Sequence, residues 1–320
     1  MQSVRATVIA GGVLMSTLSA FAQEEPRSVE ANGITFSYLE AGRGPLVLCL
    51  HGFPDTPHTW DLLLPRLAAA GYRAVAPWLR GYHPSSSPAD GDYSARALGQ
   101  DVLALIADLG EERAIVIGHD WGAMAGYAAA SLEPARIEKL VTVAIPHPSA
   151  VRLDGSFLRR SWHFFYYGLL PWYPTRALEK ERGVGSVPWI YARWSPGWNP
   201  GAEELAHVRR SFDGPRGNGS GLAGPIAYYR AFAQLALRPA ERRFLQRPTS
   251  VPTLTILGRR DGALGLRDPE RTRAGFSGPY TLLLLDVGHF VQREAPEDFA
   301  RAVFAFIGGE RAGLAGRAGD

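Results

Sequence analysis

A short run of small residues around one aspartate most constrains how this chain folds. The run Gly118-His119-Asp120-Trp121-Gly122 joins an apolar, strand-like segment (residues 114–117) to a helix-like segment (residues 122–132). A strand that passes directly into a helix needs a sharp turn, and small residues on both sides allow a turn that lifts the central side chain above the sheet. Aspartate also caps helices often, so capping is the alternative role for Asp120.

Short apolar runs alternate with amphipathic stretches on both sides of this turn. The strand-like runs cover residues 34–39, 46–50, 73–76, 114–117, 140–145, 253–257 and 281–285. The helix-like runs cover residues 60–70, 95–109, 122–132 and 297–307. Alternation of this kind predicts an α/β fold with a mostly parallel, eight-stranded sheet and helices on both faces.

Residues 147–247 interrupt that alternation. Their aromatic-rich, helix-like segments cover residues 157–170, 188–194, 202–212 and 225–237, and no clear strand lies among them. Such a block predicts a helical cap over the carboxyl ends of the strands, where open α/β sheets bind ligands. We therefore expect a core made of residues 23–146 and 248–309, and a flexible tail at residues 310–320.

The N-terminus resembles a cleaved secretory signal. Arg5 precedes an apolar stretch at residues 6–18, and Ala20-Phe21-Ala22 has the form of a cleavage site. We expect cleavage after Ala22 and a secreted or periplasmic mature protein. An uncleaved N-terminal anchor helix is the alternative, although the apolar stretch is short for a span of about 20 residues.

Composition narrows the classes of partner. Cys49 is the single cysteine of the 320 residues and lies in an apolar run, so no intrachain disulfide can form and we expect a buried thiol. The formal charge of +3 comes from arginines scattered along the chain and not from a basic block. This distribution does not indicate nucleic-acid binding. No further long apolar segment predicts a membrane span. A homodimer stays possible.

The choice of aspartate over serine at the turn changes the chemistry that is expected. A serine alkoxide attacks a carbonyl, whereas a carboxylate is suited to displacing a leaving group from saturated carbon, which leaves an alkyl ester on the enzyme. Water would then attack the carbonyl of Asp120 itself. The sequence therefore predicts Asp120 as a nucleophile towards an epoxide or an alkyl halide.

Two further positions complete a nucleophile–acid–base order. His289, in Gly288-His289-Phe290, follows the last predicted strand, where a general base is expected, and Asp261 follows the preceding strand and would orient it. Asp268 and Asp286 are alternatives for the orienting acid. An oxyanion site is expected from the backbone N–H groups of Phe53, in the His51-Gly52-Phe53-Pro54 run, and of Trp121. We expect His51 itself to be structural.

Together, the HGFP, GHDWG, GxxD and GHF motifs, with a helical segment between the second and third, resemble the epoxide hydrolases of the α/β-hydrolase superfamily over nearly the whole mature chain. Haloalkane dehalogenases, which are similar, carry asparagine at the position of Phe53. Fluoroacetate dehalogenases carry arginine at the positions of Trp121 and Met124. Both departures favour the epoxide hydrolases.

The resemblance implies two cap groups that bind and protonate the epoxide oxygen, because an alkoxide leaving group needs an acid whereas a halide does not. Tyr229 matches the second family tyrosine, and His163 occupies the position of the first. Tyr166, Tyr167 and Tyr228 are alternatives. A His/Tyr pair resembles the secreted Cif-like subgroup, although that subgroup takes its acid after the sixth strand, where this chain has Ala144.

The resemblance implies a cofactor-free and metal-free epoxide hydrolase acting on an apolar small molecule. Trp121, Phe53 and Phe164 are expected to line the substrate pocket. Two other functions stay open: a haloalkane or haloacid dehalogenase with the same triad, and a secreted effector or ligand receptor on a hydrolase fold.

Overall fold

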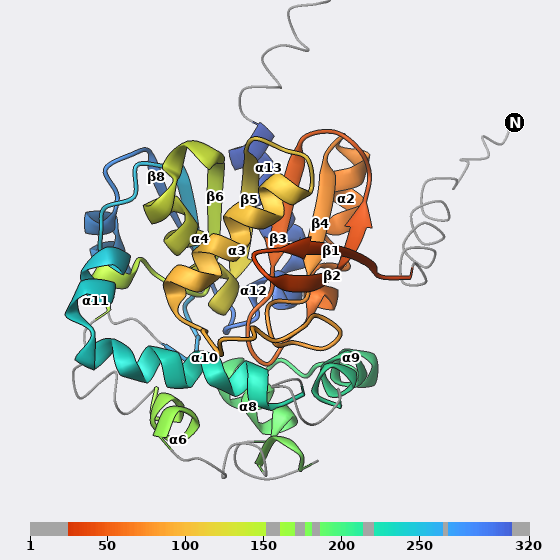
Figure 1. Ribbon diagram of the computed structural model, residues 1–320, viewed down its shortest axis with the longest axis vertical. Helices are drawn as coiled ribbons and strands as arrows, with labels where there is room; N and C mark the ends of the chain where they lie inside the picture. Colours follow the sequence, from red (N-terminus) through yellow and green to blue (C-terminus); the bar gives the residue numbers. More distant parts are fainter. Residues whose placement is uncertain are drawn as a thin grey trace, which may run out of the picture.

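The computed structural model describes residues 25–151, 161–169, 177–180, 186–213, 221–264 and 268–308. The expected signal segment and C-terminal tail therefore lie outside the described residues. The centre of the molecule is an eight-stranded sheet with the order β1-β2-β4-β3-β5-β6-β7-β8 (Figure 1). Its strands are β1 (Arg27–Ala31), β2 (Ile34–Ala41), β3 (Leu46–Leu50), β4 (Arg73–Pro77), β5 (Ala114–His119), β6 (Ile137–Val143), β7 (Thr253–Gly258) and β8 (Tyr280–Leu285).

The sheet is parallel from β4 to β8, and β2 pairs antiparallel with both β1 and β4. The predicted α/β fold with a mostly parallel, eight-stranded sheet is confirmed. Strand β1 is missing from the strand-like runs that the sequence indicated. Its signal was the Asn32-Gly33 pair, whose φ angles of 50° and 73° make the tight turn of the β1–β2 hairpin.

Helices cover both faces of the sheet. Helices α3 (Ala95–Asp108) and α4 (Trp121–Leu132) lie on one face, and α12 (Val291–Glu294) and α13 (Pro296–Gly308) lie on the other (Figure 1). The helix predicted for residues 60–70 is wrong in extent. The chain instead forms a short 3₁₀ turn, η1 (Pro57–Trp60), and then α2 (Leu64–Ala69), because Pro65 fits a first helical turn but not a helix interior.

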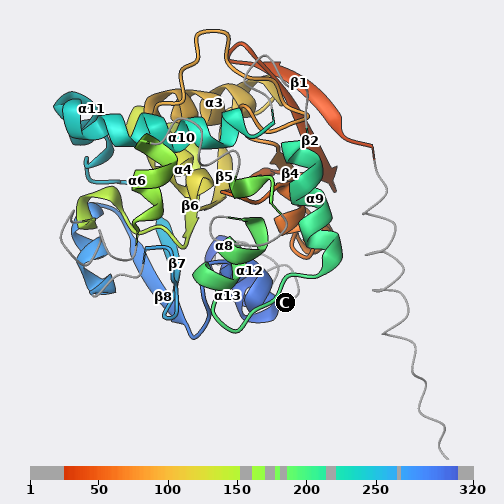
Figure 2. The same cartoon turned by 90° about the horizontal axis from the view of Figure 1, so that it is seen from below.

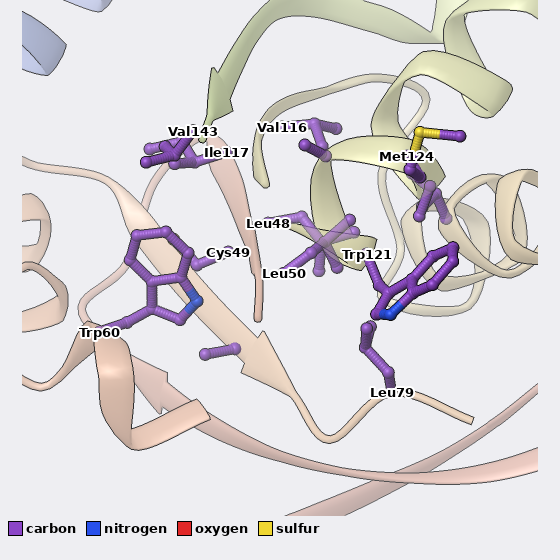
Figure 3. Close-up of a cluster of buried hydrophobic side chains, with 14 of the residues drawn as sticks. Leu48, Cys49, Leu50, Trp60, Leu79, Val116, Ile117, Trp121, Met124 and Val143 are labelled. Carbon is purple, nitrogen blue, oxygen red and sulfur yellow. The ribbon is translucent and has the colours of Figure 1, made fainter. Parts of the chain in front are cut away.

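Apolar strands form the core. Every residue of β3 and β5 is buried, and Leu48, Cys49, Val116 and Ile117 meet in one cluster (Figure 3). The expectation of a buried thiol is confirmed, and burial raises the pKa of Cys49 above its ordinary value. Strand β6 ends at Val143, two residues before the predicted end, and Ala144 follows with a φ of 65°.

The described helices between β6 and β7 are α6 (His163–Leu169), α8 (Val187–Trp194), α9 (Ala202–Phe212), α10 (Ala223–Ala233) and α11 (Pro239–Leu245). Short 3₁₀ turns are η2 (Pro134–Arg136), η3 (Pro148–Ala150), η4 (Gln234–Leu237) and η5 (Pro269–Gly275). Helices α6, α8, α9 and α10 gather at one end of the sheet, and the view from below shows them lying across it (Figure 2). Among the described residues, no helix combines the length and apolarity that crossing a membrane requires.

Candidate active site

Asp120 occupies a strained turn between β5 and α4. Its φ of 49° and ψ of −115° lie in a region that side-chain-bearing residues rarely adopt. Close approach of the chain explains the flanking glycines, since a Cβ on Gly118 would lie 2.3 Å from the carbonyl oxygen of Gly122. A Cβ on Gly122 would likewise lie 2.2 Å from the carbonyl oxygen of Leu50. The Asp120 side chain makes no capping hydrogen bond to α4, so it does not fill the alternative role.

The two carboxylate oxygens of Asp120 face different groups. Oδ1 accepts a 2.9 Å hydrogen bond from the backbone N–H of Phe53, and Oδ2 lies 3.6 Å from Nε2 of His289. Burial alone would raise the pKa of Asp120, but its contact with His289, the nearby imidazole of His119 and the Phe53 N–H together lower it. The carboxylate is therefore ionised at neutral pH. The Phe53 half of the predicted oxyanion site is in place, and the Trp121 half stays a prediction.

His289 and Asp261 meet as the sequence analysis expected. Nδ1 of His289 lies 2.8 Å from Oδ2 of Asp261, so this nitrogen carries a proton, and Nε2 faces Asp120. Oδ1 of Asp261 accepts hydrogen bonds of 2.7 and 3.1 Å from the backbone N–H groups of Ala263 and Leu264, which fix the carboxylate. Burial lowers the pKa of His289, but the two carboxylates outweigh it and raise the pKa to about 10.

The two rival acids lie on the surface. Asp286 is largely exposed and pairs with Arg260 at 3.3 Å. Asp268 is also exposed. Of the three candidate acids, Asp261 is the one hydrogen-bonded to His289. Ala144, which stands where the Cif-like subgroup has its acid, is buried and offers no carboxylate.

Tyr229 and Tyr228 are neighbours on α10 with different surroundings. The Tyr228 hydroxyl donates a 2.9 Å hydrogen bond to the backbone carbonyl of Arg80 and is thus held by the core. The ring of Tyr229 lies 5.1 Å, between centroids, from each of Phe53 and Trp121. The ring of Tyr228 lies 5.6 Å from that of Trp121 but packs against Tyr82 and Tyr93 rather than against Phe53. Burial and then the negative charge of Asp120 raise the pKa of Tyr229 well above its ordinary value, so its hydroxyl is protonated.

His163 lies on the same side of the nucleophile. Its ring centroid is 6.2 Å from that of Tyr229 and 4.8 Å from that of Trp194. Burial lowers its pKa to about 3, so the imidazole is neutral. The ring of Tyr167 also reaches this group, 4.9 Å from Tyr229, and keeps its place among the alternatives. The Phe164 side chain lies outside the described residues.

Tyr166 packs beside Tyr167, with ring centroids 4.3 Å apart, and its ring also lies 4.8 Å from that of Trp162. Of the aromatic rings expected around the nucleophile, those of Phe53 and Trp121 are buried there. Figure 3 shows Trp121 beside Leu79, at the end of the apolar cluster. The candidate site is therefore a polar group enclosed by aromatic side chains.

The sequence analysis missed a hydrogen-bonded support beneath His289. Ser195, directly after α8, accepts hydrogen bonds from the N–H groups of His289 (2.9 Å) and Phe290 (3.2 Å). Its hydroxyl donates to Oε1 of Glu294 at 2.6 Å, and Oε2 of Glu294 accepts from the N–H of Gly288 at 2.8 Å. No local motif marks Ser195, because its partners are about a hundred residues further along the chain.

Two other histidines near the nucleophile are held by the backbone. Nε2 of His51 accepts a 3.1 Å hydrogen bond from the N–H of Leu79, and Nδ1 donates to the carbonyl of Gly52 at 2.9 Å. Nε2 of His119 donates to the carbonyl of His289 at 3.1 Å. Burial lowers the pKa of His51 to about 4 and that of His119 to about 3. Both imidazoles are therefore neutral, and their hydrogen bonds hold the backbone of the segments around the nucleophile in position.

Comparison with known proteins connects this geometry to a family. The family model of the alpha/beta hydrolase fold matches residues 45–296. The chain is 39% identical to epoxide hydrolase 3 of Siraitia grosvenorii, an alignment that covers 89% of this chain and 98% of that protein. It is 30% identical to epoxide hydrolase A of Mycobacterium tuberculosis, with 88% and 97% covered.

The similarity extends to solved structures. The crystal structure of an epoxide hydrolase from Vigna radiata superposes with a TM-score of 0.74 at 26% identity, and covers 88% of this chain and 97% of that chain. The family match over residues 45–296 includes strands β3 to β8, the turn that holds Asp120 and the described helices between β6 and β7.

Proposed function

This chain belongs to the epoxide hydrolase family of the α/β hydrolase fold, and we propose that it converts an epoxide to a vicinal diol through a covalent ester on Asp120. The observation that carries the proposal is the orientation of the Asp120 carboxylate. Oδ1 is held by the N–H of Phe53, while Oδ2 faces His289 without a hydrogen bond to the helix. Oδ2 is thus the oxygen free to attack carbon.

Ring opening needs an acid for the departing oxygen. In the proposed first step, Oδ2 of Asp120 bonds to an epoxide carbon and the C–O bond breaks, while Tyr229 and His163 bind the epoxide oxygen. The raised pKa of Tyr229 keeps a proton available, and the neutral His163 can donate an N–H. Tyr229 gives its proton to the alkoxide. The protonated His289 then gives up its own proton, which passes through solvent to Tyr229.

Ester hydrolysis is the second step. Formation of the ester removes the negative charge of Asp120, which is one of the two charges that raise the pKa of His289. The pKa of His289 therefore falls, and the imidazole is neutral once its proton has passed to Tyr229. The neutral imidazole can then take a proton from water. The hydroxide attacks the Asp120 carbonyl carbon, and the charge on Oδ1 is stabilised by the Phe53 N–H. The bond between the carbonyl carbon and Oδ2 then breaks, so Oδ2 leaves with the product and the oxygen from water takes its place. The departing alkoxide takes the proton of the new carboxyl group, which releases the diol and leaves Asp120 ionised and His289 protonated.

We further propose that the chain shares with the Cif-like enzymes the His/Tyr pair that opens the epoxide ring, here His163 and Tyr229. It differs from them in the position of the acid that orients the catalytic histidine. His163 takes the place of the first tyrosine, and the hydrogen bond between His289 and Asp261 supports the acid after β7. The aromatic rings around the nucleophile favour apolar or aromatic epoxides.

The test is to trap the ester. In His289→Gln the first step should proceed and the second should stop, so mass spectrometry should find the mass of the epoxide added to a peptide that contains Asp120. Asp120→Asn is the matched control and should take up no mass. A panel of small, aryl and fatty-acid epoxides that yields no adduct at all would refute the mechanism.

Halide release separates this proposal from the dehalogenase alternative. A dehalogenase would release halide from haloalkanes or haloacids and would not depend on the Tyr229 hydroxyl. We expect epoxide turnover to exceed halide release for substrates of the same carbon skeleton. The reverse order would favour the dehalogenase.

We also propose that the protein acts outside the cytoplasm. The support is the signal-like run before Gln23, since a basic residue, an apolar stretch and an A-x-A site occur in that order. N-terminal sequencing of the exported protein should begin at Gln23. A mature protein that retains Met1 in the cytoplasm would contradict export.

A further inference from the structure

Three potential metal ligands meet where α9 contacts the core. His58 lies in η1 and Asp61 directly follows it, whereas His207 lies on α9. One donor atom from each of the three side chains lies within 4.8 Å of the other two. The two imidazole rings are 3.5 Å apart between centroids, and Nδ1 of His58 lies 3.1 Å from Oδ2 of Asp61. None of the three takes part in the proposed chemistry.

We propose that His58, Asp61 and His207 form a binding site for a divalent ion of the zinc class, which joins α9 to the core. Two imidazoles and one carboxylate are a donor set that zinc uses in proteins, with water in the fourth position. Around a tetrahedral zinc ion, neighbouring donor atoms are about 3.3 Å apart. The separation between His58 and Asp61 already fits that value, and the His207 ring must turn out of its stack to complete the set.

The chemistry and the exposure of the three side chains also suit a metal site. Each side chain offers one donor atom, and imidazole nitrogen and carboxylate oxygen both bind zinc at about 2.0–2.2 Å. All three side chains are partly exposed, which leaves the ion a path from solvent.

The surrounding charges both oppose and support a cation. Arg210 donates a 2.8 Å hydrogen bond to Nδ1 of His207, so it occupies the lone pair that a metal would need. Arg293 is the second nearby cation, but it forms an ion pair with Glu204, which is three residues before His207 on α9. Asp61 supplies the negative charge of the ligand set. Arg210 is therefore the direct competitor, and its removal should improve metal binding.

Such an ion would restrain the substrate pocket without entering it. Helix α9 ends at Phe212, whose ring lies 6.3 Å from that of Phe53, the residue that donates to Asp120. On the core side, η1 begins four residues after Phe53. A metal bridge between η1 and α9 would hold the rings of Phe53 and Phe212 at a fixed separation and would stabilise the packing of α9 against the core.

The test measures metal binding directly, on protein purified without a polyhistidine tag and stripped of metal. Titration with Co²⁺, followed by the visible absorption of the bound ion and by competition with Zn²⁺, should show one saturable equivalent. His207→Gln and Asp61→Asn should each weaken binding at least tenfold. Zn²⁺ should raise the Tm of the wild-type protein and leave that of His207→Gln unchanged, because an ion that binds the folded state stabilises it.

Three variants make the assignment falsifiable even where a ligand substitution disturbs folding. Arg210→Gln removes an exposed side chain and should tighten binding several-fold. His83→Gln is a matched control at a histidine outside the cluster and should bind as the wild type does. His289→Gln should also bind normally. Absence of a saturable equivalent, unchanged affinity in His207→Gln, or loss of the ion in His289→Gln would each overturn the proposal.

Discussion

The backbone N–H of Phe53 donates a 2.9 Å hydrogen bond to Oδ1 of Asp120. This bond holds Oδ1 where it will be the carbonyl oxygen of the proposed ester. This contact divides the two oxygens between two tasks. Oδ2 is left towards His289, at 3.6 Å, and is the proposed point of attack. Oδ1 becomes the carbonyl oxygen of the ester, and the same N–H then stabilises the charge that develops on it.

The difference between Tyr229 and Tyr228 gives the first prediction. Tyr229→Phe should slow the formation of the ester by about 10²-fold or more, since it removes a general acid. Tyr228→Phe removes the hydrogen bond to Arg80 and should cost about 1 kcal/mol of the free energy of unfolding, with little effect on ester formation. Rapid mixing with epoxide and chemical denaturation measure the two quantities. Equal rates in the two variants would contradict the assignment of Tyr229.

Asp261→Asn tests the orientation of the base. Asparagine keeps the shape but removes the charge that holds the proton on Nδ1 of His289, so hydrolysis of the ester should slow by up to about 10⁴-fold. The ester on Asp120 should then accumulate during turnover and be visible by mass spectrometry. Asp286→Asn, at the exposed rival acid, is the control and should retain turnover. Failure of Asp286→Asn in place of Asp261→Asn would reassign the acid.

The raised pKa of His289 predicts a pH dependence of stability. The pKa is about 10 in the folded protein, against an ordinary value of 6.5, so the protonated form is favoured by folding. Its stabilising contribution is complete below pH 6.5 and is lost as the pH rises towards 10. The free energy of unfolding of the wild type should therefore fall over this window more steeply than that of His289→Gln. Parallel curves for the two proteins would show that His289 is not held protonated.

Ser195 predicts a kinetic effect that a purely structural residue would not have. Ser195→Ala removes the acceptor for the N–H of Phe290 and one of the two acceptors for the N–H of His289, the other being the carbonyl of Trp194 at 3.1 Å. Ester hydrolysis should therefore slow while ester formation by Asp120 is little changed. Ser186→Ala, at the other end of α8, is the matched control, since its hydroxyl caps that helix. Both should lose about 1 kcal/mol of stability. A matching loss of hydrolysis in Ser186→Ala would remove the special role of Ser195.

The local pattern of the sequence predicted most of the backbone near the site. Strand β3 and helix α9 have the predicted bounds, and the glycines around Asp120 predicted the turn. The motifs after β7 and β8 predicted that Asp261 and His289 would meet, because parallel strands end at the same edge of a sheet. These features could be predicted because their signals are local: the periodicity of apolar residues, the turn-forming residues and the order of the strands along the chain.

The resemblance favoured Tyr229 over Tyr228, but the different contacts of the two side chains came only from the tertiary structure. Adjacent residues on a helix point about 100° apart, and which direction faces the nucleophile depends on how α10 lies across the sheet. The meeting of Ser195 with His289, and of His207 with His58, depends in the same way on the placement of α8 and α9. The sequence determined which residues could do chemistry. Packing between segments far apart in the chain decided which of them face Asp120, because no local pattern encodes those distances.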